Sequence, residues 1–311
     1  MSHFPKISGM LTGLLMACSA HAGKLSIVID DFGYRPAQEN LVLQMPPAIS
    51  VAVLPNAPHA REMATRAHQR GHEVLIHLPM APLSKQPLEK DTLRPDMSLA
   101  EIERIIHEAT LNVPYAVGLN NHMGSAMTSS LEGMQKVMQV LNHYNFYFLD
   151  SMTIANSQSF RAAQGTRVKV IKRRVFLDDT QNEADIRQQF MRAVRLAQRD
   201  GSAIAIGHPH PTTVKVLQQM LPTLPADITL VRPGQLLNEP QNNKPTSLPA
   251  QSKPAPVQSA FRGVKICPVK VVPIPASQAL NSVAESLSNS AIVHYFSTNF
   301  SGLRMRSGNQ P

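Results

Sequence analysis

Residues 25–34, with the sequence L-S-I-V-I-D-D-F-G-Y, decide the fold. The apolar, β-branched first half of this stretch ends in two adjacent carboxylates, Asp30 and Asp31, and a glycine. Such a run is typical of a parallel strand covered on both faces, and βα folds build their sites at the carboxyl ends of these strands. Because successive strand residues point to opposite sides, one aspartate can face a metal ion and the other a proton. The alternative for an isolated Asp pair is a helix N-cap or an Asx-turn.

Strand-like and helix-like patterns alternate along the chain after this first strand. Ser98 and Glu101 form a capping box, and Gly71 stands where a helix C-cap is expected. The expected strands are residues 25–31, 48–54, 73–78, 115–119, 146–149, 168–177, 202–206 and 228–231. The expected helices are 36–45, 58–70, 98–110, 131–143, 182–199 and 212–221. The alternation predicts an α/β fold with a parallel sheet, either closed as a barrel or doubly wound.

Acidic and imidazole side chains follow the predicted strands. They are Asp30, Asp31, His77, His122, Asp150, Asp178, Asp179, His208 and His210. In a parallel barrel these residues converge on one mouth, whereas any one of them alone could be a capping, surface or buried structural residue. A mixture of Asp and His suits a divalent cation such as Zn²⁺ with an open position. Together with a carboxylate base and an imidazole acid, it predicts amide or ester hydrolysis.

The composition indicates a globular protein. Of 311 residues, 43% are apolar and 16% are charged, and the formal net charge is +9. The positive residues are scattered, with the densest group at Lys169, Lys172, Arg173 and Arg174, and we see no nucleic-acid-binding motif. We therefore expect a solvated basic surface and no nucleic-acid partner. The sequence also has neither the G-x-S-x-G motif of serine hydrolases nor a glycine-rich phosphate loop.

The N-terminus has the layout of a secretory signal peptide. Lys6 precedes the apolar run 10–17, and Ala20-His21-Ala22 matches a small-residue cleavage site. We expect residues 1–22 to be removed, the mature protein to begin at Gly23, and its location to be periplasmic. The apolar run is too short for a transmembrane helix, and a lipidated Cys18 is the competing interpretation. With Cys18 removed, Cys267 is a single thiol without an intrachain partner.

The composition changes near residue 239. Residues 239–258 are rich in Pro, Asn, Gln, Ser and Lys, residues 261–275 are basic with alternating valines, and residues 278–296 could form an amphipathic helix. The expected organisation is a signal peptide (1–22), a barrel domain (23–238) and a flexible C-terminal tail (239–311). The tail is a candidate contact for an envelope protein partner.

Five motifs, in order, resemble the divergent polysaccharide deacetylase family. They are I-V-I-D-D-F-G-Y, G-H-E-V-L-I-H-L-P-M, N-N-H-M-G-S, F-L-D-S and I-A-I-G-H-P-H-P, and the resemblance covers about residues 24–238. The family belongs to the NodB-type carbohydrate deacetylase superfamily. The resemblance implies an irregular (β/α) barrel with seven or eight parallel strands, a divalent metal, zinc first among them, and a polysaccharide or peptidoglycan substrate.

The resemblance also implies roles for individual residues. Asp30 matches the catalytic base, Asp31 and His77 match metal ligands, and His208 matches the late histidine that acts as acid. NodB-type enzymes carry a second metal histidine shortly after the first, but residues 78–83 contain none, so His122 is expected to replace it. The expected substrate-binding or supporting residues are Asn121, Asp150, Asp178 and His210.

Three functions remain open on this evidence. The first is a secreted, metal-dependent carbohydrate deacetylase. The second is a catalytically silent carbohydrate-binding or envelope-interaction protein on the same fold, which the missing histidine would favour. The third is a glycosidase that pairs Asp30 with Asp150 or Asp178, because two carboxylates suffice for that chemistry.

Overall fold

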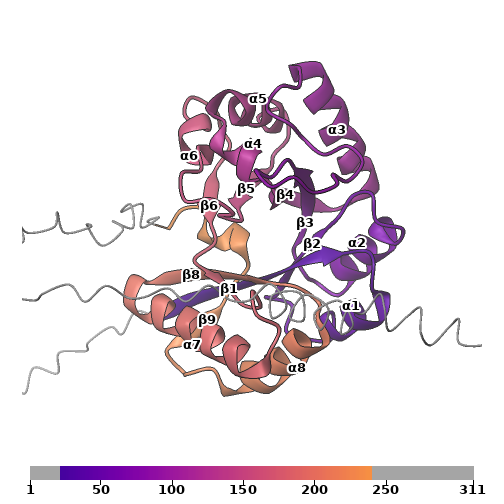
Figure 1. The fold of residues 1–311 in the computed structure, drawn as a ribbon. Helices are drawn as coiled ribbons and strands as arrows, with labels where there is room; N and C mark the ends of the chain where they lie inside the picture. The colour runs from indigo at the N-terminus through magenta and orange to yellow at the C-terminus, as the bar shows by residue number, and fades with distance from the viewer. Residues whose placement is uncertain (1–21, 240–311) are drawn as a thin grey trace, which may run out of the picture. The chain divides into compact units, whose positions relative to one another are not determined.

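The computed structural model describes residues 22–239, in which nine strands alternate with helices (Figure 1). The strands are β1 (Gly23–Phe32), β2 (Ser50–Val53), β3 (Val74–Met80), β4 (Ala116–Met123), β5 (Tyr147–Asp150), β6 (Val170–Lys172), β7 (Val175–Phe176), β8 (Ser202–Gly207) and β9 (Ile228–Leu230). The α-helices are α1 (Pro36–Val42), α2 (Ala60–Gln69), α3 (Leu99–Asn112), α4 (Ser125–Ser129), α5 (Leu131–Leu141), α6 (Ser159–Ala162), α7 (Glu183–Asp200) and α8 (Pro211–Met220). Two 3₁₀ turns, η1 (Leu221–Thr223) and η2 (Pro233–Leu236), flank β9.

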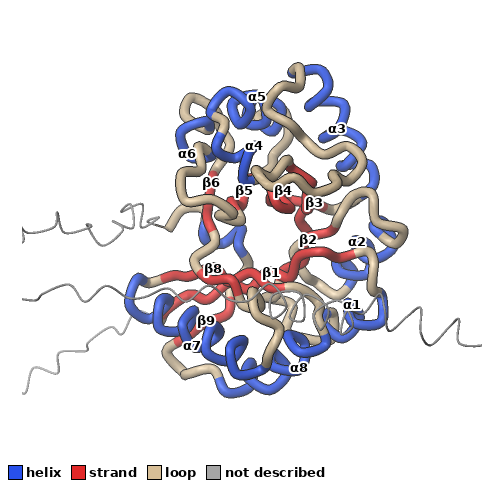
Figure 2. The backbone as a smooth tube through the Cα atoms, in the orientation of Figure 1, coloured by secondary structure: helices blue, strands red, loops and turns tan. Residues whose placement is uncertain are grey.

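The strands form one parallel sheet that curves into an incomplete barrel (Figure 2). Eight strands follow the order β6-β5-β4-β3-β2-β1-β8-β7, and β9 pairs with β1. Every pairing between these strands is parallel, which requires the crossover helices between them. The predicted irregular (β/α) barrel is thereby confirmed.

The barrel is open between β6 and β7, and here one expectation was wrong. Residues 168–177 were expected to form one strand, but they form two short ones. The backbone N–H of Arg173 donates to the Asp150 carbonyl on the β5 side at 2.9 Å, whereas that of Arg174 donates to the Ile204 carbonyl on the β8 side at 2.8 Å. The chain therefore crosses from one edge of the sheet to the other between these two arginines.

Strand β1 lies at the centre of the sheet. One of its edges pairs with β9 at residues 23–25 and with β2 from Val28 onward, and the other pairs with β8 from Lys24 to Ile29. The apolar residues of β1 are almost completely buried, as expected for a strand covered on both faces. β1 runs from Gly23 to Phe32, so the aspartate pair lies within the last residues of the strand.

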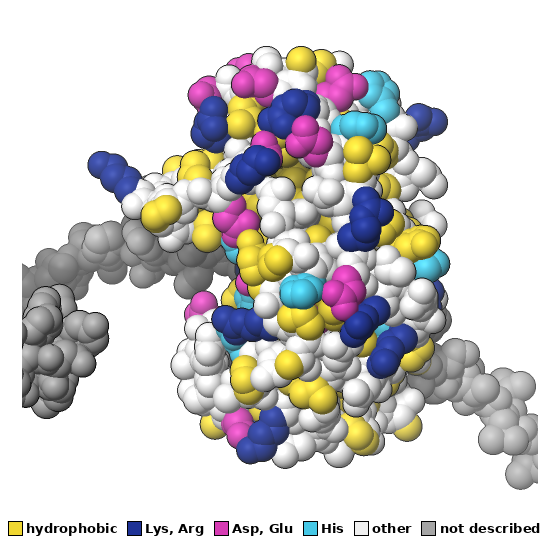
Figure 3. All heavy atoms as spheres, turned by 90° about the vertical axis from the view of Figure 1, so that its right-hand side faces the viewer, with side chains coloured by type: hydrophobic (Ala, Val, Ile, Leu, Met, Phe, Trp, Pro, Cys, Tyr) yellow, Lys and Arg dark blue, Asp and Glu magenta, His cyan; other side chains and the backbone are white. Residues whose placement is uncertain are grey.

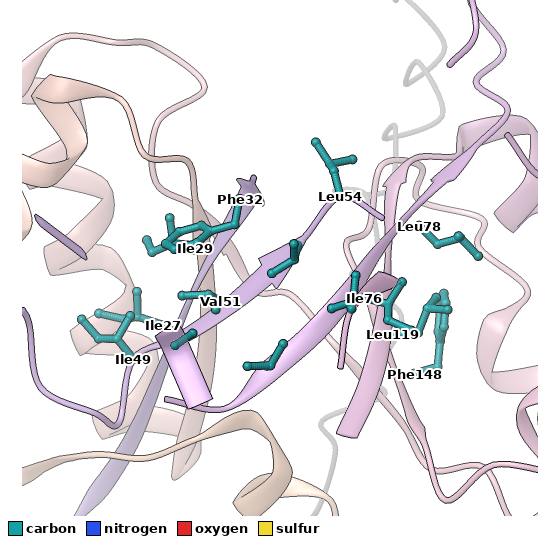
Figure 4. Close-up of a cluster of buried hydrophobic side chains, with 14 of the residues drawn as sticks. Ile27, Ile29, Phe32, Ile49, Val51, Leu54, Ile76, Leu78, Leu119 and Phe148 are labelled. Atoms are coloured by element: carbon teal, nitrogen blue, oxygen red, sulfur yellow. The ribbon is translucent and has the colours of Figure 1, made fainter. Parts of the chain in front are cut away.

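Side chains of the sheet alternate between two apolar clusters. The larger cluster lies between the sheet and the helices and includes Ile27, Ile29, Val51, Ile76 and Phe148 (Figure 4). The smaller cluster contains the intervening residues, such as Val28 and Ile206, together with Leu236 of η2. The period of two in β1 thus fills both layers of the core.

Several helices begin or end at capping residues, and the box at Ser98 was predicted. Ser98 forms the capping box with Glu101, the side chain of Asn182 caps α7, and α7 ends at Gly201 in the left-handed conformation. The methionines of α5, Met134 and Met138, are buried in the core. The short helices α4 and α6 were not expected from the sequence. Among residues 22–239, no helix has both the length and the apolar character needed to cross a bilayer.

Charged residues are dispersed over the face of the molecule that Figure 3 shows. On that face, basic, acidic and apolar side chains are interleaved without a patch of one sign. The predicted signal peptide, Cys18, Cys267 and the C-terminal tail lie outside the described residues, apart from residue 22 and residue 239 at the boundaries.

Candidate active site

The carboxyl ends of four strands, out of five that are consecutive in the sheet, bring the predicted site residues together. Asp30 and Asp31 lie near the end of β1, His77 is in β3, and His208 directly follows β8. β4 is longer than expected, so His122 lies in this strand rather than in a loop, and its register places it opposite Pro79 of β3. The parallel order of β4, β3, β2, β1 and β8 therefore places all five side chains at one edge of the sheet.

Asp31, His77 and His122 point three ligand atoms at one another. Asp31 Oδ1 lies 3.1 Å from His122 Nδ1 and 3.3 Å from His77 Nε2, and the two ring nitrogens are 3.1 Å apart. Asp31 Oδ1 is buried and makes no hydrogen bond of acceptable geometry within residues 22–239. Asp31 also has a φ of 58°, an unusual left-handed conformation that re-aims its side chain at the end of the strand.

The outer nitrogens of the two histidines face oxygen atoms, one at hydrogen-bond distance and one farther away. His77 Nδ1 lies 2.8 Å from Asn120 Oδ1, and His122 Nε2 lies 3.5 Å from Glu89 Oε1. In the neutral tautomers that carry the proton on these outer nitrogens, each inner nitrogen keeps a lone pair that a cation can accept. Such partners are typical of histidines that bind metals.

The three inner atoms fit a divalent cation. Ligands about 2.0–2.1 Å from a tetrahedral cation such as Zn²⁺ lie about 3.3–3.4 Å from one another. The separations of 3.1–3.3 Å in the protein are close to this spacing. Two imidazoles and one carboxylate also leave a fourth position open for water or substrate. The orphaned Asp31 oxygen is the observation that favours a cation here.

Asp30 is buried beside this cluster. Its side chain is only 3% exposed, Oδ2 lies 3.6 Å from His77 Nε2, and Oδ1 accepts a hydrogen bond from Asn120 Nδ2 at 2.9 Å. Burial raises the pKa of the Asp30 carboxyl, although His77 and His208 oppose this change. Burial alone would also raise the pKa of Asp31, but its contacts with His122 and His77 lower that pKa well below the usual range. The two adjacent carboxylates therefore have different protonation behaviour.

His208 faces the same cluster from the end of β8, the strand next to β1. Its Nε2 lies 3.9 Å from Asp31 Oδ2, and its Nδ1 lies 3.0 Å from Asp178 Oδ1. The other oxygen of Asp178 accepts hydrogen bonds from the His208 backbone N–H and the Thr213 hydroxyl, both at 2.7 Å. Burial opposes the charged imidazole, but the hydrogen bond and charge of Asp178 outweigh it and raise the pKa of His208 to about 9. His208 is therefore protonated at neutral pH.

Asp178, His208 and His210 also lie close enough to form a second group of potential ligands. The two Asp178 oxygens are already occupied by His208 and Thr213. His210 Nδ1 contacts the Arg35 guanidinium at 3.3 Å, and its Nε2 contacts Gln181 at 3.1 Å. These contacts place His210 beside the site in a supporting position, and they favour a structural ion pair over a cation at Asp178.

Asn121 and Asp150 support the loops around the site. Asp150 Oδ1 accepts from the Met152 backbone N–H at 2.8 Å, and Oδ2 accepts from the hydroxyls of Ser157 and Ser159, both at 2.5 Å. Asn121 Oδ1 accepts from the Ser151 backbone N–H at 2.9 Å and so ties β4 to the end of β5. Neither side chain contacts the Asp31 cluster through a hydrogen bond in the described part of the chain.

Sequence reasoning missed three residues of the site. Asn120 connects His77 with Asp30, Glu89 holds the outer nitrogen of His122, and Arg173 donates to the backbone carbonyls of Ser151 and Met152. The only signal for Asn120 was its place beside Asn121 at a strand end. Glu89 reaches the site from the proline-rich segment 81–95, which connects β3 with α3.

Comparisons with known proteins agree with this architecture. The model of the divergent polysaccharide deacetylase family matches residues 27–237. A relative described as "Uncharacterized protein YibQ" from Escherichia coli K12 is 65% identical over 291 residues, which cover 93% of this chain and 91% of the relative. An uncharacterized protein from Haemophilus influenzae is 42% identical over 225 residues, covering 72% of this chain and 80% of its own length.

A solved structure shares the fold. The crystal structure of an uncharacterized protein from Agrobacterium tumefaciens C58 matches with a TM-score of 0.65 and 20% sequence identity, covering 70% of this chain and 90% of that one. At this identity the likeness concerns the fold alone. The family match spans the barrel and all the clustered site residues, from Asp30 to His210. The chain therefore belongs to the divergent polysaccharide deacetylase family.

Proposed function

We propose that this protein is a metal-dependent N-deacetylase that acts on an envelope carbohydrate, a polysaccharide or peptidoglycan, in the periplasm. The observation that supports this most strongly is the convergence of Asp31 Oδ1, His77 Nε2 and His122 Nδ1 within 3.3 Å of one another. Membership of the deacetylase family supports the carbohydrate substrate. Asp31, His77 and His122 would hold the metal, for which zinc is our choice because of the N/O ligand set.

The reaction would be hydrolysis of an N-acetyl group. When bound, the cation lowers the pKa of water and polarises the acetyl carbonyl. Asp30 accepts a proton from the water as the water oxygen bonds to the carbonyl carbon. The raised pKa of Asp30 brings this carboxylate closer to the range suited to a general base. Its hydrogen bond from Asn120 fixes its direction.

His208 supplies the proton for the leaving group. As the C–N bond breaks, the His208 Nε2–H gives its proton to the amine nitrogen, and acetate is released. The pKa of about 9 keeps this imidazole charged at neutral pH before the reaction. Asp178 holds the Nδ1–H side of the ring, so that Nε2 points at the Asp31 cluster. Asp30 and His208 thus perform the two proton transfers from different strands.

The glycosidase alternative loses support from these contacts. A glycosidase needs two carboxyl groups that are free to act on opposite sides of the sugar bond. Both oxygens of Asp150 are occupied by Met152, Ser157 and Ser159, and both oxygens of Asp178 by His208 and Thr213. Neither Asp150 nor Asp178 is therefore free to act with Asp30 as the second carboxylate of a glycosidase.

Metal content and acetate release together test the proposal. The wild type should bind about one equivalent of zinc and release acetate from N-acetylated glycans. Asp30→Asn should keep the metal and lose about 10²-fold or more of the rate, because it cannot accept the proton. His122→Ala should lose the metal and the activity, while His143→Ala, at an exposed position just after α5, should change neither.

Two outcomes would contradict the proposal in different ways. Full activity in protein stripped of metal would exclude the metal-dependent reaction. A loaded wild type that binds peptidoglycan fragments and chitooligosaccharides, but releases no acetate from either, would instead support the catalytically silent binding protein. Equal metal affinity in His122→Ala and the wild type would remove His122 from the ligand set.

A further inference from the structure

A cavity of about 600 Å³ adjoins the proposed active site. It is formed by the segments after β5, from β6 to β7, and at the start of α7. The residues that matter for its chemistry are Thr153, Arg173, Phe176, Asp179, Gln189 and Arg192. None of these residues has a role in the proton transfers described above, so the cavity needs an explanation of its own.

Phe176 and Arg173 connect the cavity to the site. The Phe176 ring packs edge-on against the His208 ring, with 5.2 Å between the centroids. The Arg173 guanidinium carbon lies 4.9 Å from the centroid of the same Phe176 ring. A ligand group in the cavity therefore lies beside the imidazole that would protonate the leaving amine.

The cavity contains positive charge that no contacting carboxylate neutralises. Arg173 donates through Nε and Nη2 to two backbone carbonyls, at 2.6 and 2.8 Å, which leaves Nη1 without a protein partner in the described part of the chain. Arg192 contacts only the neutral Gln189 Oε1, at 3.3 Å, within residues 22–239. By contrast, Arg174 is paired with Asp200 at 2.8 Å.

The acidic residues of the lining do not contact these two arginines. Asp185 is used in the cap of α7, where its backbone N–H and carboxylate both contact Asn182. Asp179 is exposed at the rim and forms no ion pair among the described residues. Burial lowers the pKa of Arg173. The negative charges of Asp30, Asp150 and Asp179 oppose this effect, and the positive charge of Arg192 adds a smaller contribution in the same direction as burial. The free Nη1 of Arg173 and the guanidinium of Arg192, which contacts no carboxylate in the described part of the chain, are therefore available to a bound anion.

We propose that the cavity between β6, β7 and α7 binds an anionic group, a carboxylate or a phosphate, carried by the carbohydrate whose N-acetyl group enters the active site. Arginine forks match both oxyanions, and Phe176 supplies an apolar wall for the sugar. The inference rests on the proposed function, because it specifies the substrate class of the same site. It assigns Arg173 and Arg192 to substrate recognition.

Binding of three related sugars to the whole protein tests this inference. The probes are N-acetylglucosamine, N-acetylmuramic acid with its carboxylate, and N-acetylglucosamine 6-phosphate, each titrated by NMR. We expect at least one anionic sugar to bind about tenfold more tightly than the neutral one, as for one charge-assisted hydrogen bond. The comparison of the two anionic probes shows whether the carboxylate or the phosphate is recognised.

Two matched variants distinguish the effect of an arginine in the cavity from the effect of the protein's overall positive charge. Arg192→Gln and Arg195→Gln each remove one positive charge from α7, but only Arg192 lines the cavity. Arg192→Gln should abolish most of the preference for the anionic sugar, and Arg195→Gln should change it less than twofold. Equal binding of all three sugars, or equal effects of the two variants, would overturn the inference.

This experiment can fail independently of the proposed function. Binding is measured without turnover, and acetate release from neutral chitooligosaccharides is scored separately. Acetate release without a preference for anionic sugars would support the deacetylase proposal and exclude the anion site. A charge preference lost in Arg192→Gln, without acetate release from any substrate, would support the anion site on a protein that binds but does not hydrolyse.

Discussion

Replacement of Asp178 by asparagine should strongly lower the pKa of His208. The side-chain carbonyl of the introduced amide can still accept from the His208 backbone N–H and Thr213, which turns the amide NH₂ group toward His208 Nδ1. This NH₂ group donates to Nδ1, so the neutral ring is stabilised and the charged ring is disfavoured. Loss of an opposite charge at this distance lowers a pKa by about 1–3 units.

The magnitude follows from the pKa of His208 in the folded protein. The difference between the ordinary value of 6.5 and about 9 corresponds to about 3 kcal/mol of stabilisation of the charged ring. Because the folded-state pKa is above the unfolded one, this stabilisation is complete below about pH 6.5 and is lost as the pH rises through about 9. Asp178→Asn should therefore reduce the free energy of unfolding more at pH 6 than at pH 9.5.

The assay is an NMR titration of the His208 ring in protein stripped of metal, assigned with His208→Gln. The wild-type ring should titrate near pH 9, and the ring in the Asp178→Asn variant at least about one pH unit lower. Thr213→Val is the control, because it removes a 2.7 Å hydrogen bond to the same carboxylate but keeps the charge. An unchanged His208 titration in Asp178→Asn, or equal shifts in both variants, would refute this account of how Asp178 acts.

Three further predictions concern the metal, the core and the N-terminus. Asn120→Leu should weaken zinc binding about 10–100-fold, measured against a chelator, because His77 loses its orienting acceptor, whereas Asn120→Asp keeps an acceptor and should bind zinc more tightly than Asn120→Leu. Phe148→Ala should lower the free energy of unfolding by about 3–5 kcal/mol in urea titrations, since Phe148 is fully buried, and a loss below about 1 kcal/mol would contradict its place in the core. The exported protein should begin at Gly23 in N-terminal sequencing, and a lipid-modified Cys18 at the terminus would show the competing cleavage instead.

Local patterns were sufficient to predict a parallel α/β sheet and the group of residues at its carboxyl edge, whereas the irregular barrel was implied by the resemblance to a family. The apolar run before Asp30 and the strand-like segments before His77 and His208 each show in the sequence as short β-branched stretches followed by polar residues. Parallel strands share one carboxyl edge, so these residues could be expected together without knowing the strand order. Even His122 was expected at this edge, although its strand proved longer than its apolar residues suggested.

Details that depend on long-range contacts could not be predicted. Asn120 looks like any polar residue at a strand end, and its importance comes from the simultaneous approach of His77 and Asp30. The barrel is open because the backbone of Arg173 bonds to the β5 side of the sheet and that of Arg174 to the β8 side. Two adjacent arginines in a sequence give no sign of this difference. Asp150 resembled a catalytic carboxylate because the serines that occupy its oxygens come later in the chain.

The central position of β1 has a consequence for how the protein loses activity on heating. Its backbone is hydrogen-bonded to β2, β8 and β9, so Asp30 and Asp31 are attached to the strand with the most partners in the sheet. These two side chains cannot be displaced by fraying at the periphery of the molecule. Amide hydrogens in the middle of β1 should consequently be among the slowest to exchange with solvent, and thermal inactivation should coincide with cooperative melting of the whole barrel.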